Sequence, residues 1–296
     1  MSGREGVAGA APDDPRGPGA PLSAGMSLTC GGVSFSYEEA RAAIPALRDV
    51  SFELRAGGSL ALMGASGSGK STLLQVIRGL DEPESGAVLL DAAGPVGIGH
   101  AVLQREVGLV FQAPELQLFA STARDDVAFG PRRLGWPEAQ VTAAVDTALD
   151  VVGLPPAHFA ERHPYALSGG EQRRLALAGV LAMRPRLLLL DEPFVSLDPG
   201  TRRQLVGILE RLKAAGVTLL LATHDVDLAW ALCDELLVLG GGRVVAAGSW
   251  DFSTAGRRLL AANRLREPFF VELWRRLGRD PQRAPRGAAE AAEALS

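Results

Sequence analysis

The sequence predicts an α/β fold with a mainly parallel core sheet, helices on both faces, an antiparallel β subdomain and a helical insertion. Two observations predict this fold. Apolar runs of strand length alternate along the chain with amphipathic stretches at helical spacing, which is typical of a parallel sheet covered by helices. A glycine-rich loop joins one such run, Leu60 to Met63, to the helix that follows it. The 296 residues, 47% of them hydrophobic, are enough for one large or two small domains.

Composition limits the class of partner. The net charge of −4 gives no overall basic field, so we expect no nucleic-acid partner. No apolar run approaches the roughly 20 residues that span a bilayer, so we expect any membrane role to act through a partner. The two cysteines, Cys30 and Cys233, have neither disulfide-framework nor metal-ligand spacing, which is typical of a reducing cytosol.

The N-terminal part of the chain predicts a tail and then two paired strands. Residues 1–25 hold almost no large apolar side chains, so we expect a disordered tail. The main domain, expected over residues 26–250, opens with alternating segments at Ser27 to Phe35 and Val50 to Leu54, typical of antiparallel strands. Tyr37 follows the first segment, and on its chemistry alone it is more often a packing residue than a platform for a flat base.

The glycine-rich loop has the spacing G-x-x-x-x-G-K-[ST] of a phosphate-binding loop. Its residues are Gly64, Ala65, Ser66, Gly67, Ser68, Gly69, Lys70, Ser71 and Thr72. The glycines let backbone N–H groups surround phosphate oxygens, the helix N-terminus adds its positive dipole end, and Lys70 adds a point charge. Ser71 is then placed to ligate magnesium. The alternative is a flexible Gly/Ser turn, but such a turn rarely carries Lys and Ser at a helix start, and this chain has only two lysines.

Beyond this loop the chain changes from strands to helices and back. Strands are expected at Ala87 to Leu90 and at Val107 to Phe111, the second of which ends at Gln112. A helical subdomain is expected over about residues 113–175. Strands and helices then alternate again. Helices are expected over Glu171–Met183, from Pro199 to near Gly216 and from Asp225, and strands at Leu187–Leu190 and Val217–Thr223. A closing hairpin is expected from Glu235–Leu239 and Arg243–Ala247.

The C-terminal part is predicted to be helical and then loose. Residues 251–279 are amphipathic and rich in arginine, so we expect a helical extension. Residues 280–296 consist mainly of Pro, Arg, Ala and Glu, and we expect a disordered tail in which Ala288 to Leu295 could form a frayed helix.

Two tandem carboxylates end the strand Leu187 to Leu190, at the edge of an open α/β sheet where ligands collect. Asp191 suits a magnesium contact, because hard divalent ions take oxygen ligands. Glu192 is then available to orient and activate water as a general base. A solvated acidic turn is the alternative for an isolated Asp-Glu, but this pair follows four leucines and lies downstream of a phosphate loop.

A second anion-binding helix start is expected at a short glycine-containing motif. Its residues are Leu167, Ser168, Gly169, Gly170 and Glu171. Ser168 and the backbone amides after it precede a helix, so they have the chemistry of an N-cap and of a phosphate site.

Together these motifs resemble those of ATP-binding-cassette (ABC) ATPase subunits, which are P-loop NTPases, over roughly residues 27–248. The resemblance rests on the phosphate loop, the LSGG motif, Gln112, Asp191-Glu192, Ser196-Leu197-Asp198 and His224. It implies an ATPase that uses ATP and Mg²⁺. It also implies a second ABC ATPase subunit, a copy or a paralogue, whose nucleotide site is completed by the LSGG motif of this chain.

The resemblance implies roles for single residues. Gln112 would contact magnesium and water and face a transmembrane partner, Asp198 would lie at the dimer seam, and His224 would bond the γ-phosphate. Alone, His224 would more often be a satisfied histidine at a sheet edge. Tyr37 would stack on adenine, which reverses the preference from chemistry alone. The implied catalytic set is Lys70, Gln112, Glu192 and His224, and the implied magnesium set is Ser71, Gln112 and Asp191.

A narrower resemblance is to the energy-coupling-factor branch, which drives uptake of vitamins and of cobalt or nickel. It is carried by the segments Phe111 to Ala120 and Asp125 to Pro131. It implies a transmembrane transporter subunit bound near Gln112 to Pro131, and a peripheral location on the cytoplasmic face of the membrane. Arg266-Glu267-Pro268 also fits the dimerising extension of that branch. The chain departs from the pattern at Phe194-Val195-Ser196, where Thr-Ala-Gly is usual, and at Ala123, where Val is usual.

Other functions remain as alternatives. One is the ATPase of an ordinary ABC importer or exporter, which the segment from Glu115 to Pro131 would distinguish. Another is a soluble ABC ATPase of repair, translation or cluster assembly, whose usual twin cassettes, coiled-coil insertions and basic surfaces are not seen in this sequence. A regulatory module without catalysis would be expected to lack Glu192 or the LSGG motif, and both are present.

Overall fold

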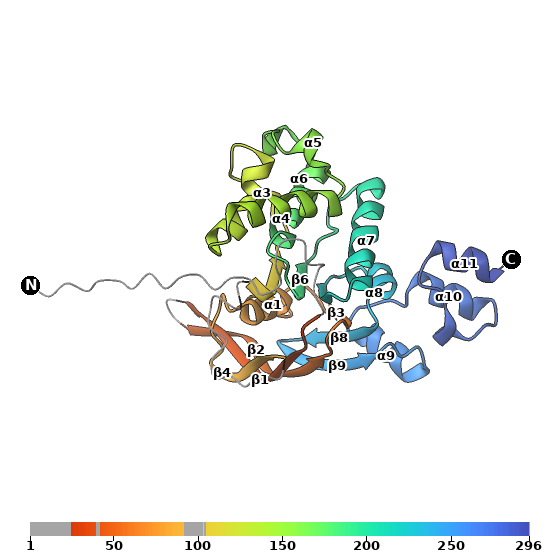
Figure 1. Ribbon diagram of the computed structural model, residues 1–296. Coiled ribbons are helices and arrows are strands. Elements are labelled where there is room, and N and C mark those ends of the chain that lie inside the picture. The colour runs from red at the N-terminus through yellow and green to blue at the C-terminus, as the bar shows by residue number, and fades with distance from the viewer. Residues whose placement is uncertain (1–24, 40–41, 92–102, 104, 296) are drawn as a thin grey trace, which may run out of the picture.

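The computed structural model describes residues 25–39, 42–91, 103 and 105–295. Figure 1 shows two sheets in the lower half, a group of helices above them, and the C-terminal helices at one side. The tail predicted over residues 1–25 lies outside the described residues except for Gly25. Within the described ranges, no helix combines the length and apolarity needed to cross a bilayer.

The smaller sheet is antiparallel, with the strand order β2-β1-β4. Its strands are β1 (Leu28–Glu39), β2 (Ala42–Leu54) and β4 (Ser85–Leu90). The first two extend further than expected, because the polar stretch between them keeps antiparallel pairing out to Glu39 and Ala42. The extended pairing carries Tyr37, which packs edge-on against Phe35 with ring centroids 5.0 Å apart.

The larger sheet has the order β5-β6-β7-β3-β8-β9, and its first five strands are parallel. The strands are β3 (Ser59–Met63), β5 (Val107–Val110), β6 (Leu187–Asp191), β7 (Thr218–Ala222), β8 (Glu235–Gly240) and β9 (Arg243–Ser249). The β9 strand pairs antiparallel with β8 and closes the sheet as the predicted hairpin. The predicted α/β class is confirmed.

Both faces of the larger sheet are covered, which explains its continuous apolar runs. Along β6, Leu188 and Leu190 belong to one hydrophobic core, whereas Leu187 and Leu189 belong to the other. This alternation follows from the period of two in a strand. A leucine in β6 is therefore buried whichever face it occupies.

Replacing Leu189 by Ala is expected to lower the free energy of unfolding by about 2–5 kcal/mol, because the fully buried side chain leaves a cavity. Chemical denaturation measures the change. Val245→Ala is the control, since Val245 is 41% exposed on β9 and its truncation should cost well under about 1 kcal/mol. Equal losses in the two variants would contradict the core assignment.

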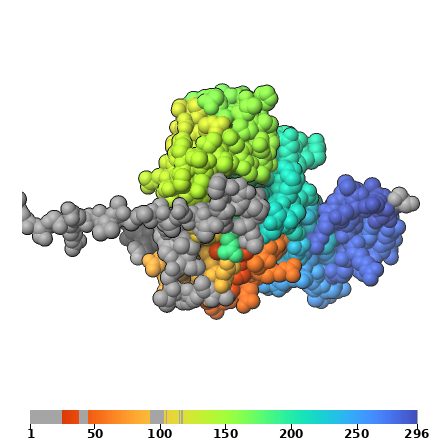
Figure 2. Space-filling model, in the orientation of Figure 1, coloured from red at the N-terminus to blue at the C-terminus, as the bar shows by residue number. Residues whose placement is uncertain are grey.

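Helices flank the sheets and form the insertion. The phosphate loop leads into α1 (Lys70–Arg78), and α7 (Pro199–Ala214) and α8 (Val226–Leu232) follow later strands. The insertion contains η1 (Pro114–Gln117), α3 (Ala123–Arg133), α4 (Glu138–Val151), α5 (Pro156–Phe159), η2 (Pro164–Ala166) and α6 (Gly169–Leu181). Helix α6 begins two residues before the predicted Glu171, because Ser168 and Glu171 form a capping box at its start. Figure 2 shows this insertion as a separate green lobe.

The C-terminal extension contains α9 (Thr254–Ala262), α10 (Phe269–Arg276), η3 (Pro281–Arg283) and α11 (Ala288–Leu295). The tail predicted over residues 280–296 holds η3 and, at Ala288–Leu295 where the sequence allows a frayed helix, α11. Trp230 of α8 donates its indole N–H to the carbonyl of Pro285 at 2.9 Å, and the Arg286 guanidinium lies 3.5 Å from the centre of the same indole ring. These contacts with a distant part of the chain supply the order that the local composition does not predict.

Candidate active site

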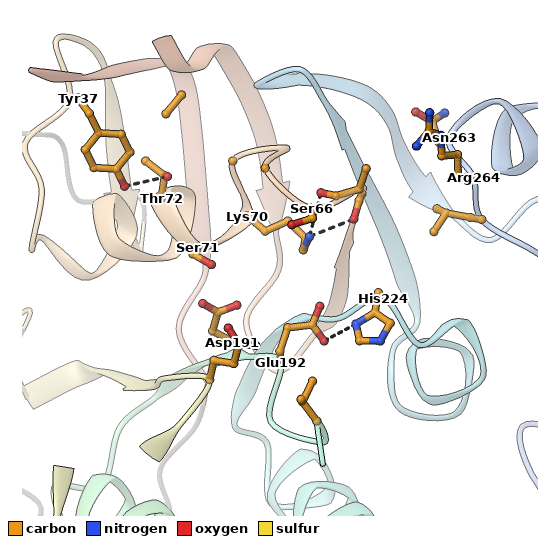
Figure 3. A pocket seen from close by; sticks show the side chains of 18 of the residues that line it. Tyr37, Ser66, Lys70, Ser71, Thr72, Asp191, Glu192, His224, Asn263 and Arg264 are labelled. Carbon is orange, nitrogen blue, oxygen red and sulfur yellow. Dashed lines mark hydrogen bonds and ion pairs between the residues drawn. The ribbon is translucent and has the colours of Figure 1, made fainter. Parts of the chain in front are cut away.

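A cavity of about 770 Å³ lies where the parallel strands end and the phosphate loop begins. Most of the site residues predicted from the sequence motifs line this cavity (Figure 3). The predicted residues that line it are Tyr37, Gly64, Ala65, Ser66, Gly67, Gly69, Lys70, Ser71, Thr72, Gln112, Asp191, Glu192 and His224. Ser68, the LSGG motif and Asp198 are outside this lining.

The phosphate loop needs glycine at two tight points. A Cβ at Gly64, where φ is 148°, would lie 2.3 Å from the carbonyl oxygen of Leu239. A Cβ at Gly69, where φ is 101°, would lie 2.6 Å from the carbonyl oxygen of Ala46. Both contacts are with backbone, so a side chain at either position would displace the loop.

The loop presents donors to an anion. Lys70 donates its ammonium to the carbonyls of Gly64 at 3.0 Å and Ala65 at 3.2 Å, which holds the charge across the loop. No side chain caps the N-terminus of α1, so the first backbone N–H groups of this helix are available to a ligand. An uncapped helix start beside a fixed ammonium has the chemistry of a phosphate site.

Tyr37 stands at one rim of the cavity. Its hydroxyl lies 3.0 Å from Oγ1 of Thr72 and donates to Oε1 of Gln75 at 3.2 Å. The side chain is therefore tied to α1 while Tyr37 as a residue stays 41% exposed (Figure 3). This arrangement leaves an aromatic surface open to a flat ligand next to the phosphate loop.

Asp191 and Ser71 present oxygen ligands side by side. Asp191 ends β6 and is 8% exposed. The pKa of its carboxyl is raised, mainly by burial and further by the charge of Glu192. The hydrogen bond with Ser71 and the charge of Lys70 oppose this shift. A hydroxyl and a carboxylate in contact are hard oxygen ligands, so these two residues fit Mg²⁺. A divalent cation between them would favour the ionised carboxylate that burial disfavours.

Glu192 and His224 form a contact in the lining of the cavity. The Nδ1 atom of His224 lies 2.9 Å from Oε2 of Glu192 (Figure 3). Glu192 has a left-handed backbone with φ of 47°, which turns the chain sharply after the strand ends. Its side chain is 13% exposed, whereas that of His224 is 69% exposed. A nearly buried carboxylate is thus held beside an accessible imidazole.

The LSGG motif and Asp198 cap helices away from this cavity. Ser168 donates from its backbone N–H at 2.7 Å and its hydroxyl at 2.8 Å to Glu171, and these bonds lower the pKa of the Glu171 carboxyl. Asp198 accepts from the backbone N–H groups of Gly200 at 2.8 Å and Thr201 at 3.1 Å. A single chain therefore does not bring these motifs to its own phosphate loop.

The sequence does not predict two features near the cavity. Arg173 of α6 donates to Glu115 at 3.2 Å and to the carbonyl of Val195, which lines the cavity. The turn 263–265 of the C-terminal extension also lines the cavity. Neither feature carries a local motif, since the partners of Arg173 are 58 and 22 residues away in the chain.

Comparisons with known proteins agree with this geometry. The family described as "ABC transporter" matches residues 47–195. The chain is 42% identical to the cobalt import ATP-binding protein CbiO of Rhodobacter capsulatus over 83% of this chain and 88% of that protein. It is 40% identical to the energy-coupling factor transporter ATP-binding protein EcfA2 of Methanospirillum hungatei over 78% of this chain. That match spans 58% of the Methanospirillum protein, a little over half of its length.

A solved structure gives the same result. CbiO1 of Clostridium perfringens, described as part of the ABC transporter complex CbiONQ, superposes with a TM-score of 0.67 and 33% identity. The match covers 79% of this chain and 90% of that one. The predicted resemblance to ABC ATPases is confirmed, and the chain belongs to the family of ABC transporter ATP-binding proteins, which are ATPases.

Proposed function

We propose that this chain binds MgATP between two subunits and hydrolyses it to drive a membrane importer of the energy-coupling-factor type. The observation that carries the proposal is one cavity that holds a phosphate loop, the Asp191–Ser71 pair and the Glu192–His224 contact. Similarity to a cobalt import ATP-binding protein supports a cobalt, nickel or vitamin importer.

The nucleotide is held at three points. Tyr37 receives the adenine ring, and the amides at the start of α1 with Lys70 bind the phosphates. Ser71, Gln112 and Asp191 would hold Mg²⁺. When bound, magnesium helps neutralise the charge that develops on the phosphate oxygens.

Hydrolysis needs a water molecule placed in line with the γ-phosphate. Glu192 orients this water and accepts its proton. His224, whose Nδ1 lies 2.9 Å from Glu192, bonds the γ-phosphate. Positioning and charge stabilisation by Lys70 and Gln112 supply the remaining rate enhancement. Each group therefore acts on an atom of the phosphoryl transfer.

A second subunit completes the site. Ser168 and the backbone amides of Gly169 and Gly170 begin α6, a helix of 13 residues, and reach the phosphates of the facing subunit. Asp198 lies at the seam between the subunits. The capping geometry of these residues outside their own cavity supports this composite site, with a copy of the chain or a paralogue as partner.

The membrane partner binds near Gln112 to Pro131. Phe119 and Phe129 are 62% and 49% exposed and pack edge-on with ring centroids 4.9 Å apart. An exposed aromatic pair is typical of a protein-binding surface. Glu115 in the same segment pairs with Arg173, which contacts the loop after Glu192. A movement of the membrane partner would therefore be transmitted through Glu115 and Arg173 to the loop beside Glu192. Binding there places the chain on the cytoplasmic face of the membrane.

The docking surface is tested by the double substitution Phe119→Asp and Phe129→Asp. We expect it to reduce recovery of the co-expressed membrane subunit at least tenfold, because charge replaces the apolar contact, and to leave the ATPase rate of the isolated protein unchanged. Affinity purification in detergent measures recovery, with Leu80→Asp, at a leucine 54% exposed, as the control. Equal recovery by both variants would contradict the docking site, and recovery of a permease dependent on a solute-binding protein would contradict the importer type.

A further inference from the structure

Helix α8 connects the catalytic histidine to the C-terminal extension. His224 comes just before this seven-residue helix, and Asp225 caps it by accepting from the backbone N–H groups of Asp227 and Leu228, both at 3.1 Å. In the described part of the chain, the one side-chain hydrogen bond of His224 is with Glu192. The position of the exposed imidazole therefore depends on how α8 is held.

The extension binds the start of α8 through Asp227. Arg266 donates from Nη1 to Oδ1 of Asp227 at 3.4 Å and from Nη2 to Oδ2, so both carboxylate oxygens are engaged. The backbone N–H of Phe269 donates to the same Oδ1 at 2.6 Å. The bond with Asp227 raises the pKa of Arg266. Three donors from one turn thus converge on a single carboxylate three residues after the histidine.

The extension also binds the other end of α8. Trp230 is 4% exposed, and the Arg286 guanidinium lies on its ring and donates to its carbonyl at 2.6 Å. Arg286 donates as well to the carbonyl of Cys233 at 3.0 Å. The extension therefore contacts α8 at both of its ends.

The turn that carries Arg266 also borders the nucleotide cavity. Asn263, Arg264 and Leu265 line it, and Figure 3 shows Asn263 and Arg264 on the side of the phosphate loop opposite Tyr37. Arg264 has a left-handed backbone with φ of 61°, and this sharp turn directs the following residues toward α8. The same short segment therefore contacts the cavity and the helix behind His224.

We propose that Arg266 is a positioning residue for ATP hydrolysis: its bond to Asp227 fixes α8 and so holds His224 against Glu192 and the γ-phosphate. This inference rests on the proposed hydrolysis of MgATP. Loss of the bond leaves the first turn of α8 held by the Phe269 N–H on Asp227 and by Arg202 on Asp225, which loosens the imidazole before that turn without touching the phosphate loop or Tyr37. A displacement of this kind reduces the chemical step rather than nucleotide binding.

Arg266→Ala is expected to lower kcat for MgATP about tenfold and to change KM less than about twofold. Arg266→Lys should recover part of the loss, because an ammonium keeps one charged bond but not the two-pronged geometry. Asp227→Asn keeps the shape of the side chain and should reproduce the defect. It therefore tests the same bond if Arg266→Ala is poorly folded. The control is Arg276→Ala, which removes an exposed ion pair with Glu272 on α10.

A double-mutant cycle with His224→Ala separates positioning from general stability. Arg266→Ala should add no further loss to the residual rate of His224→Ala, because the group it positions is already absent. An Arg266→Ala rate equal to that of Arg276→Ala, or the same loss in both backgrounds, would overturn the inference. If wild-type protein assayed with its facing subunit hydrolyses no MgATP, the proposed function itself is rejected; an active wild type with an unaffected Arg266→Ala variant rejects the inference alone.

Discussion

Glu192→Gln is expected to lower the rate of MgATP hydrolysis by about 100- to 10,000-fold, the usual contribution of a general base. The amide keeps the size of the carboxylate and can still bond His224 2.9 Å away, so the site keeps its shape. It loses the ability to accept a proton from water. Nucleotide affinity should change little, because Glu192 does not belong to the phosphate loop. Phosphate release under saturating MgATP measures the effect.

Glu272→Gln is the matched control for this variant, since Glu272 is an exposed glutamate on α10 whose partner is Arg276. Its hydrolysis rate should equal that of the wild type. A Glu192→Gln rate within about twofold of the control would show that another group accepts the proton, and the assigned role of Glu192 would then be wrong.

Lys70→Ala is expected to weaken ATP binding by about 10- to 100-fold. A hydrogen bond to a charged group contributes about 1.5–3 kcal/mol, and the Lys70 ammonium, which now bonds the carbonyls of Gly64 and Ala65, is the charged donor of the phosphate loop. Equilibrium binding of a labelled, non-hydrolysable ATP analogue measures the loss. The uncapped start of α1 remains, so some affinity should persist.

The chain offers its own control for this substitution, because Lys213 is the other of its two lysines. Lys213 pairs with Asp234 at 2.9 Å and does not line the cavity. Lys213→Ala should therefore leave the analogue's affinity unchanged. Equal affinity for the Lys70 and Lys213 variants would exclude the phosphate loop as the main anion site.

The fold could be predicted where local pattern and burial agree. The strand Leu187 to Leu190 is a continuous apolar run because both of its faces are covered, and the run is readable without any partner. The order of residues 280–295 could not be predicted in this way. It depends on Arg286 and Pro285 meeting Trp230, about 55 residues earlier in the chain, and no periodicity in the tail reports that contact.

The same distinction between local pattern and tertiary contact holds for the residues of the candidate site. The phosphate loop and the tandem carboxylates each follow a strand, so their place at the sheet edge follows from parallel topology. The turn 263–265 lines the cavity, and Arg173 contacts the carbonyl of Val195 in its lining, only through tertiary packing. An arginine in an arginine-rich chain carries no signal for such a contact until the elements are placed in space.

ATP hydrolysis in a site shared by two chains requires that the chains associate when MgATP binds. The mass in solution of the Glu192→Gln protein with its facing subunit, with and without MgATP, measures this association. The predicted result is an ATP-dependent change from one chain of 31.0 kDa to a complex of two chains, which persists because the nucleotide is not hydrolysed. The contradicting result is a protein that stays at 31.0 kDa at ATP concentrations at which the wild type hydrolyses ATP.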